Sequence, residues 1–156
     1  MQEEKLFFIK NDLFSHLDKL SDANRNWGKM SAQQMVEHLA DFFNVSTEKI
    51  IFDLVTPEEH LPKYKEFLLS DKQFRENTKA PASVLGEDPL PLKYVSYGIA
   101  VDELRAAIDS FIEYFKNAPG KKTSHPVFGP LDFEEWVLLH YKHVTHHLRQ
   151  FEHHPD

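Results

Sequence analysis

Helical periodicity is the feature that most constrains how this chain can fold. Apolar residues recur at steps of three and four in four separate segments, residues 5–20, 31–53, 101–117 and 132–152. This spacing gathers apolar side chains on one face of a helix, and that face must be buried against another element. No alternating pattern in the sequence is long enough to build a sheet. We therefore predict an all-α protein, a four-helix bundle.

Two of the predicted helices begin with capping signals. Ser31 and Gln34 have the spacing of a capping box, and Asp132 and Glu135 repeat it at the start of the last helix. In such a box each side chain binds the backbone N–H of the other residue, which satisfies donors that a helix start leaves open. Pro130, just before the second box, is typical of a chain entering a helix.

A long connection separates the second and third predicted helices. It is rich in proline, and Pro57 suits the first turn of a short helix over residues 57–70. Residues 80–98 are predicted to form an extended loop. Long loops in compact domains are usually functional or partly structured. This one could pass over one end of the bundle.

Length, charge and composition exclude several classes of protein. A chain of 156 residues suits one domain, residues 1–156. It has no cysteine, so any metal must be held by His, Asp or Glu. A net charge of −7 argues against binding nucleic acid. Without a long apolar run or a basic leader, the sequence predicts a cytoplasmic protein with no membrane span.

Histidines are concentrated near the end of the chain. Five of the 10 in the sequence lie at positions 140, 143, 146, 147 and 153. Because each helical residue advances about 100°, His143 and His147 lie one turn apart at the margin of the buried face. Their ring nitrogens could converge on one ion, about 2 Å from each. His146 is predicted to point toward solvent or a partner chain.

The second predicted helix contains a histidine within its apolar face. His38 lies among Met35, Leu39 and Phe42. A buried imidazole needs a hydrogen bond or a metal, since an unpartnered polar group costs a few kcal/mol. Helical bundles build metal sites from such inward-pointing side chains. A core histidine with a hydrogen bond, or a solvated histidine pair near a helix C-terminus, are the alternative interpretations.

Carboxylates near His38 are candidates for acid–base roles. Asp41, one turn beyond His38, is a weak catalytic candidate as a general base, or an acceptor that orients a histidine. Glu37 points about 100° away from His38 and is expected at the surface.

Three further residues are weighed for the same region. Gln150 could hydrogen-bond a ligand or the preceding helix, and Trp136 could form a pocket wall. His125 is expected in a surface or loop position, near the site only if its loop folds over the bundle.

Two short motifs resemble those of a known superfamily. QMVEHLADFF at residues 34–43 and HVTHHLRQF at residues 143–151 are similar to signatures of the DinB/YfiT-like superfamily. The resemblance implies up-down-down-up connectivity with a long irregular connection between helices 2 and 3. It also implies a divalent ion (zinc, nickel or iron) on His38, His143 and His147. His140 is an additional histidine that could bind together with His143, leaving His147 to orient a ligand.

The resemblance also implies a range of functions. Members include thiol S-transferases that use small intracellular thiols, an isomerase of maleylpyruvate type and proteins called hydrolases. We therefore expect a metal-dependent enzyme acting on a small molecule, of thiol S-transferase or hydrolase type, with a low-molecular-weight thiol as a substrate. A homodimer is expected on the same basis. The alternatives are a non-catalytic metal-binding or stress-associated bundle, and a core-histidine bundle that binds no metal.

Overall fold

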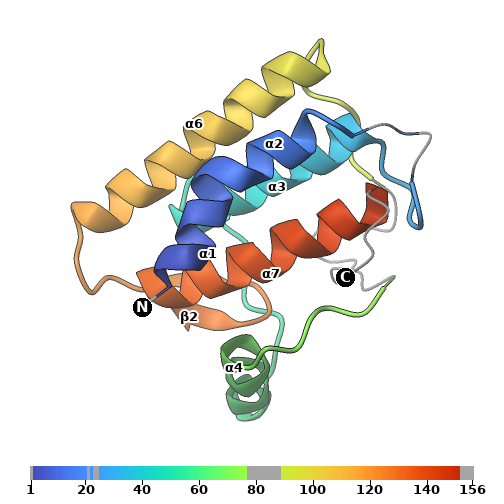
Figure 1. Cartoon of the computed structure of the whole chain (residues 1–156). Helices are drawn as coiled ribbons and strands as arrows, with labels where there is room; N and C mark the ends of the chain where they lie inside the picture. The colour runs from blue at the N-terminus through green and yellow to red at the C-terminus, as the bar shows by residue number, and fades with distance from the viewer. Residues whose placement is uncertain (1, 21, 23–24, 77–88, 152–156) are drawn as a thin grey trace.

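Helices make up most of the protein. The computed structural model describes residues 2–20, 22, 25–76 and 89–151. Figure 1 shows the arrangement of the elements, coloured along the chain. In chain order they are α1 (Glu3–Phe7), η1 (Phe8–Asp12), α2 (Leu13–Leu17), α3 (Ala32–Ser46), η3 (Glu58–His60), α4 (Leu61–Leu69), α6 (Tyr97–Lys116), β1 (Thr123–His125), β2 (Gly129–Leu131) and α7 (Phe133–Phe151). The element η1 is a π-helical turn, and η3 is a 3-10 turn.

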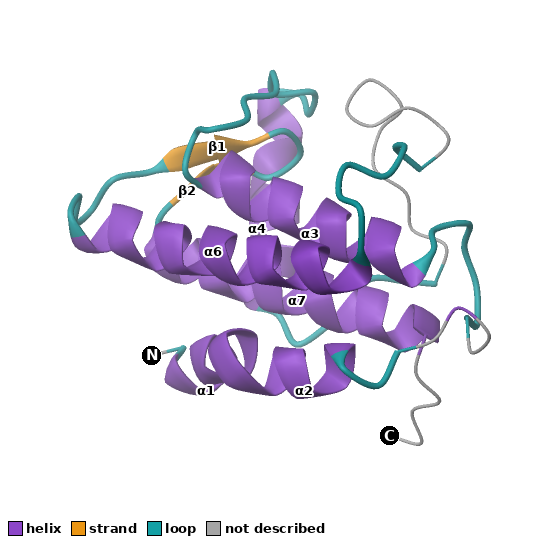
Figure 2. Cartoon of the chain, turned by 90° about the horizontal axis from the view of Figure 1, so that it is seen from above, coloured by secondary structure: helices purple, strands orange, loops and turns teal. Residues whose placement is uncertain are grey.

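Four long helical units form the bundle. The first consists of α1, η1 and α2 end to end, and it lies beside α7, while α3 packs against α6 and α7 (Figure 2). One apolar core joins the inner faces of these units, and its largest fully buried side chains include Phe43, Phe111 and Trp136. Burial of these faces is the main force that holds the bundle together. The predicted all-α bundle is confirmed.

Both predicted capping boxes are present. The Gln34 N–H donates to Ser31 Oγ over 3.1 Å, and the Ser31 N–H donates to Gln34 Oε1 over 2.8 Å. At the start of α7, Asp132 and Glu135 exchange two bonds of 2.9 Å in the same way. These caps fix where α3 and α7 begin, while the apolar face of each helix decides which way its histidines point.

The predicted end of the second helix was wrong. α3 ends at Ser46 rather than near residue 53, because Glu48 adopts a left-handed conformation with φ of 63°. The N–H of Glu48 then donates to the Val45 carbonyl, and that of Lys49 to the Asn44 carbonyl. This pair of bonds is a Schellman motif, which usually has glycine at the left-handed position.

A short antiparallel hairpin precedes α7, contrary to the prediction that the chain has no sheet. β1 pairs with β2 so that Thr123 faces Leu131 and His125 faces Gly129. Thr123 Oγ1 donates to the Ser46 carbonyl and accepts from Trp136 Nε1, both over 2.8 Å. The hairpin is therefore fixed between the end of α3 and the first turns of α7.

The long connection is structured on both sides of a part outside the described residues. η3 and α4 confirm the predicted short helix over residues 57–70. Of the loop predicted over 80–98, residues 80–88 lie outside the described part of the chain and 89–96 are irregular. Ser96 caps α6, its hydroxyl accepting from the Ile99 N–H, so α6 starts earlier than the predicted residue 101.

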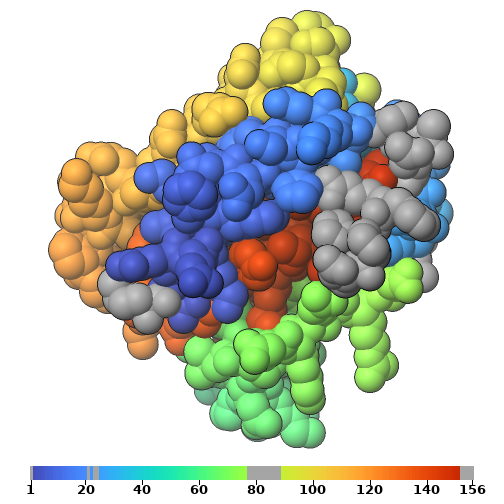
Figure 3. Space-filling model, viewed as in Figure 1, coloured from blue at the N-terminus to red at the C-terminus, as the bar shows by residue number. Residues whose placement is uncertain are grey.

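The α4 segment stands to one side of the bundle. In the space-filling view, α4 and the residues that follow it lie below the N-terminal helices, with the surface of α7 visible between them (Figure 3). No helix among the described residues has both the length and the apolar character needed to cross a membrane.

Candidate metal centre

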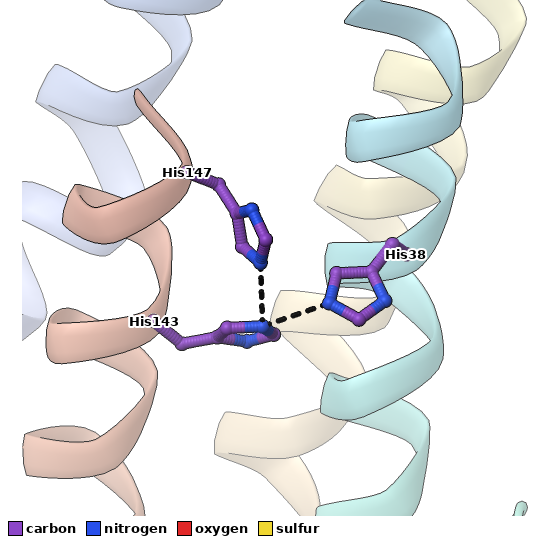
Figure 4. Close-up of side chains that lie close together, drawn as sticks. All are labelled: His38, His143 and His147. Carbon is purple, nitrogen blue, oxygen red and sulfur yellow. Dashed lines mark hydrogen bonds between the residues drawn. The ribbon is translucent and has the colours of Figure 1, made fainter. Parts of the chain in front are cut away.

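Three histidines from two helices meet inside the bundle. His38 on α3 faces His143 and His147 on α7, and the rings point toward one another (Figure 4). His143 Nε2 lies 2.9 Å from His38 Nε2 and 3.0 Å from His147 Nε2. The three ligand nitrogens all lie within 4.8 Å of one another. Two nitrogens bound to one tetrahedral ion are separated by about 3.3 Å, so small side-chain shifts would fit the group to one ion.

The three imidazoles are held in the neutral form that metal binding requires. Burial, and secondarily the neighbouring His146, lower the pKa of His38 from 6.5 to about 4. Burial is also the main reason that the pKa values of His143 and His147 fall well below 6.5, with the adjacent imidazoles as the next cause. Near neutral pH each ring therefore offers a lone pair rather than a positive charge.

Gln150 determines which nitrogen of His147 is available. His147 Nδ1 donates to Gln150 Oε1 over 2.7 Å, so the Nε2 lone pair points toward the other histidines. Gln150 is itself buried, and Gly28 lies against it with φ of 87°, where an added Cβ would come within 2.9 Å of Gln150 Nε2. A polar partner behind a metal-binding histidine fixes its tautomer and orientation.

Loss of this partner should weaken metal binding. We expect Gln150→Ala to reduce the affinity for a divalent ion by about 10- to 100-fold, because the His147 ring is then free to rotate or to change tautomer. Gln150→Glu keeps the acceptor and should retain the affinity within a few fold. Competition titrations against a coloured chelator would measure both. Equal affinities of Gln150→Ala and the wild type would contradict this role for Gln150.

His140 does not join the group. It lies in the core, with its ring stacked 3.7 Å from the Phe43 ring and 5.2 Å from the Trp136 ring. Its Nε2 contacts Ser46 Oγ over 3.3 Å, and among the described residues only His38, His143 and His147 form a histidine cluster of metal-binding geometry. The structure therefore gives no support to His140 as an additional ligand.

Both carboxylates near the site are already engaged. Asp41 Oδ1 accepts from Lys93 Nζ over 2.5 Å. Glu37, predicted at the surface, is instead 5% exposed. Its two oxygens accept from the backbone N–H groups of Lys93 and Tyr94 and from Gln33 Nε2. The prediction for Glu37 was wrong because the connection before α6 folds onto α3 and needs an acceptor there.

His146 was predicted to face solvent or a partner chain, and this was wrong. It is only 3% exposed and packs between the rings of Trp27 and Phe74. Burial is the main cause that lowers its pKa to about 4. Helical geometry gave the direction of the side chain correctly, but the segment after α4 covers that side of α7.

A large cavity opens beside the three histidines. Its volume is about 1450 Å³, and its walls include His38, His143 and His147 together with Trp136. Trp27 lines the same space, and its Nε1 is buried without a hydrogen-bond partner among the described residues. The volume exceeds the roughly 300–1,000 Å³ of typical ligand sites. A small molecule could therefore reach an ion held by the three rings.

His125 also lines this cavity. The sequence predicted that it would lie near the site only if its loop folds over the bundle. It is buried at the end of β1, not exposed in a loop, and its ring lies 5.7 Å from the ring of Phe42. Phe42 in turn contacts the rings of His38 and His143. The hairpin brings His125 to the site, and the three-residue strands that form it are too short to be seen as periodicity in the sequence.

The comparisons with known proteins agree with this architecture. No curated protein and no solved structure gave a match. The profile of the DinB superfamily matches residues 9–151, a range that contains all three converging histidines and, apart from α1, every bundle helix in whole or in part. The superfamily is one of metal-binding proteins. The chain belongs to the DinB superfamily.

Proposed function

We propose that this protein is a divalent-metal-dependent enzyme that joins a low-molecular-weight thiol, through its sulfur, to an electrophilic second small molecule, either by addition to an activated double bond or with loss of a leaving group. His38, His143 and His147 would hold the ion. The observation that carries the proposal is the convergence of three Nε2 atoms at the wall of a cavity of about 1450 Å³. Three neutral nitrogens suit zinc, nickel or iron and leave coordination positions open for a substrate.

The division of tasks follows from the positions of the side chains. A divalent ion on three neutral imidazoles supplies the charge that keeps a thiol deprotonated near neutral pH. Gln150 holds the His147 ring in place through the bond to Nδ1. The aromatic side chains of Phe42 and Trp136 form apolar walls next to the histidines, which limit access of water.

Two engaged carboxylates favour thiol transfer over hydrolysis. Hydrolysis would use a general base within hydrogen-bond reach of the attacking water. Glu37 and Asp41 are the carboxylates among the described residues that line the cavity. Glu37 holds the backbone of Lys93 and Tyr94, and Asp41 is paired with Lys93. An ion held by the three histidines would allow a thiol to give up its proton to water without such a base, so this chemistry fits the site better.

A pair of variants tests the proposal. We expect the metal-loaded protein to conjugate a small thiol to an electrophile in a substrate screen, and His38→Ala to abolish this activity. Asp41→Asn should keep the activity within a few fold, whereas a general base would lose about 10²- to 10⁴-fold. Thiol consumption, followed by a colorimetric assay, gives the rates.

Two outcomes would count against thiol transfer. An activity that persists in His38→Ala without bound metal would show that the ion is not involved. A hydrolytic activity that disappears in Asp41→Asn would instead identify Asp41 as a general base.

A further inference from the structure

His125 differs from the other buried histidines in how its ring is held. Its Nδ1 accepts two backbone hydrogen bonds, from the Val127 N–H over 2.9 Å and from the Phe128 N–H over 3.2 Å. A nitrogen that accepts two N–H groups cannot carry a proton itself. The ring proton must therefore be on Nε2, which is a donor in this tautomer.

The ring is also kept neutral. Burial lowers the pKa of His125 from 6.5 to about 3. The packed rings of Phe42, Phe128 and Trp136 surround it. At neutral pH the side chain is consequently a rigid, uncharged N–H donor. A donor that folding has already oriented loses little conformational freedom when it binds a ligand.

The Nε2–H group is available to the cavity. His125 forms part of the cavity wall, and Nε2 has no hydrogen-bond partner among the described residues. It is not one of the fully buried side-chain atoms left without a partner, so part of its surface is accessible, and the residue lines the cavity. Because Phe42 contacts both His125 and His143, one small molecule can reach from this donor to the three-histidine group.

The cavity has a positive rim in an acidic protein. Its wall includes the exposed side chains of Lys29, Lys63, Lys72, Arg75 and Lys93, of which Lys93 is paired with Asp41, and the carboxylates of Glu37 and Asp41. The whole chain carries a net charge of −7. An excess of one sign of charge at a cleft raises the local concentration of ligands of the opposite sign. The rim therefore favours anions, while the aromatic walls favour an apolar body.

From these observations we infer that His125 is a substrate-binding residue whose Nε2–H binds the carboxylate of a small apolar or aromatic acid. This deepens the proposed function, because it names the chemical class of the second substrate. It rests on the proposed function for one point, that the cavity is the substrate site. Hydrogen bonding to a carboxylate is stronger than to a neutral acceptor, which gives the site its preference for an acid.

The test uses the metal-free protein, so that failure of the metal-dependent activity does not affect its outcome. In ¹⁵N spectra of the imidazoles at neutral pH, we expect His125 to appear as the neutral Nε2–H tautomer. 3-Phenylpropanoate at millimolar concentration should shift the Nε2–H signal. 3-Phenylpropan-1-ol, which has the same ring and chain without the charge, should bind about tenfold or more weakly.

His125→Asn is the matched variant. The asparagine Oδ1 can take the place of Nδ1 as the acceptor of the turn, while the donor at Nε2 is lost. We expect this variant to bind 3-phenylpropanoate roughly 10- to 100-fold more weakly, and the alcohol within about threefold of the wild type. A melting temperature near that of the wild type would show that the turn is preserved.

Four results would overturn the inference. These are an Nδ1–H or charged His125, no response of His125 to the carboxylate, equal binding of acid and alcohol by the wild type, and unchanged carboxylate affinity in a folded His125→Asn. The first three are read from the wild-type protein, so they decide the question even if the variant does not fold.

Discussion

Replacing His143 by alanine is expected to abolish stoichiometric metal binding. His143 Nε2 makes the close contacts to both His38 and His147, so its loss removes the nitrogen that joins the group. Loss of a polar partner behind a ligand already lowers metal affinity by about 10- to 100-fold, and loss of a ligand itself should exceed that range. Mass-spectrometric metal analysis of the purified protein should give about one ion per wild-type chain and much less in His143→Ala.

Two control variants make this prediction specific. His140→Ala removes a buried histidine that stacks on Phe43, and His60→Ala removes an exposed one at the cavity wall. Both variants should bind about one ion per folded chain, as the wild type does. Retention of one ion by His143→Ala would overturn the assignment. Loss of metal in His140→Ala together with retention in His147→Ala would identify His140 as the ligand.

The sequence allowed the helices and the converging histidines to be predicted because both depend on local rules. Helical periodicity identifies the buried face and therefore the rotation of each helix about its axis, and caps such as Ser31 with Gln34 fix where the helix begins. His38 then had to point inward from α3, and His143 and His147 toward it from α7. The resemblance of two short motifs to one superfamily supported the same group.

The errors occur where contacts distant in sequence decide the conformation. The end of α3 depends on Glu48 in a left-handed conformation, which glycine would normally indicate. Tyr114 of α6 donates to the Glu48 carboxylate over 2.8 Å, and Lys121 lies 3.2 Å from the same oxygen. Neither partner is near Glu48 in the sequence, so no local pattern could reveal this helix end.

The burial of Glu37 and His146 was missed for a related reason. Each lies on a helix face that periodicity assigns to solvent, but segments of the long connection cover those faces. Lys93 and Tyr94 donate to Glu37, and Phe74 packs on His146. Helical geometry alone predicts the direction of a side chain. It does not predict which loop will lie in that direction.

Acidification is expected to unfold the metal-free protein near pH 5–6, by the linkage between proton binding and stability. Six imidazoles, those of His38, His125, His140, His143, His146 and His147, have pKa values lowered mainly by burial. Below pH 6.5 the unfolded chain binds protons that the folded protein excludes. The stability is therefore complete above pH 6.5 and is lost as the pH falls toward the folded pKa, about 4 for His38 and about 3 for His125.

The expected loss is large compared with the stability of a domain. Each neutral buried imidazole lowers the free energy of unfolding by about 1.4 kcal/mol per pH unit in this range. Six would lower it by up to about 8 kcal/mol at pH 5.5, against a usual total of about 5–15 kcal/mol. Denaturant unfolding followed by circular dichroism at pH 7.5, 6.5 and 5.5 would measure the loss.

A pair of glutamine variants separates buried histidines from exposed ones. His140→Gln should reduce the dependence of the unfolding free energy on pH by about 1.4 kcal/mol per unit, because one excluded proton is removed. His60→Gln should not change it, since that side chain is exposed in η3. A divalent ion should protect the wild type against acid, because it competes with protons for three of the six imidazoles. An unfolding free energy that stays constant from pH 7.5 to 5.5 would show that these imidazoles are protonated in the folded protein as readily as in the unfolded chain. The histidines would then be less buried than they are in the structure.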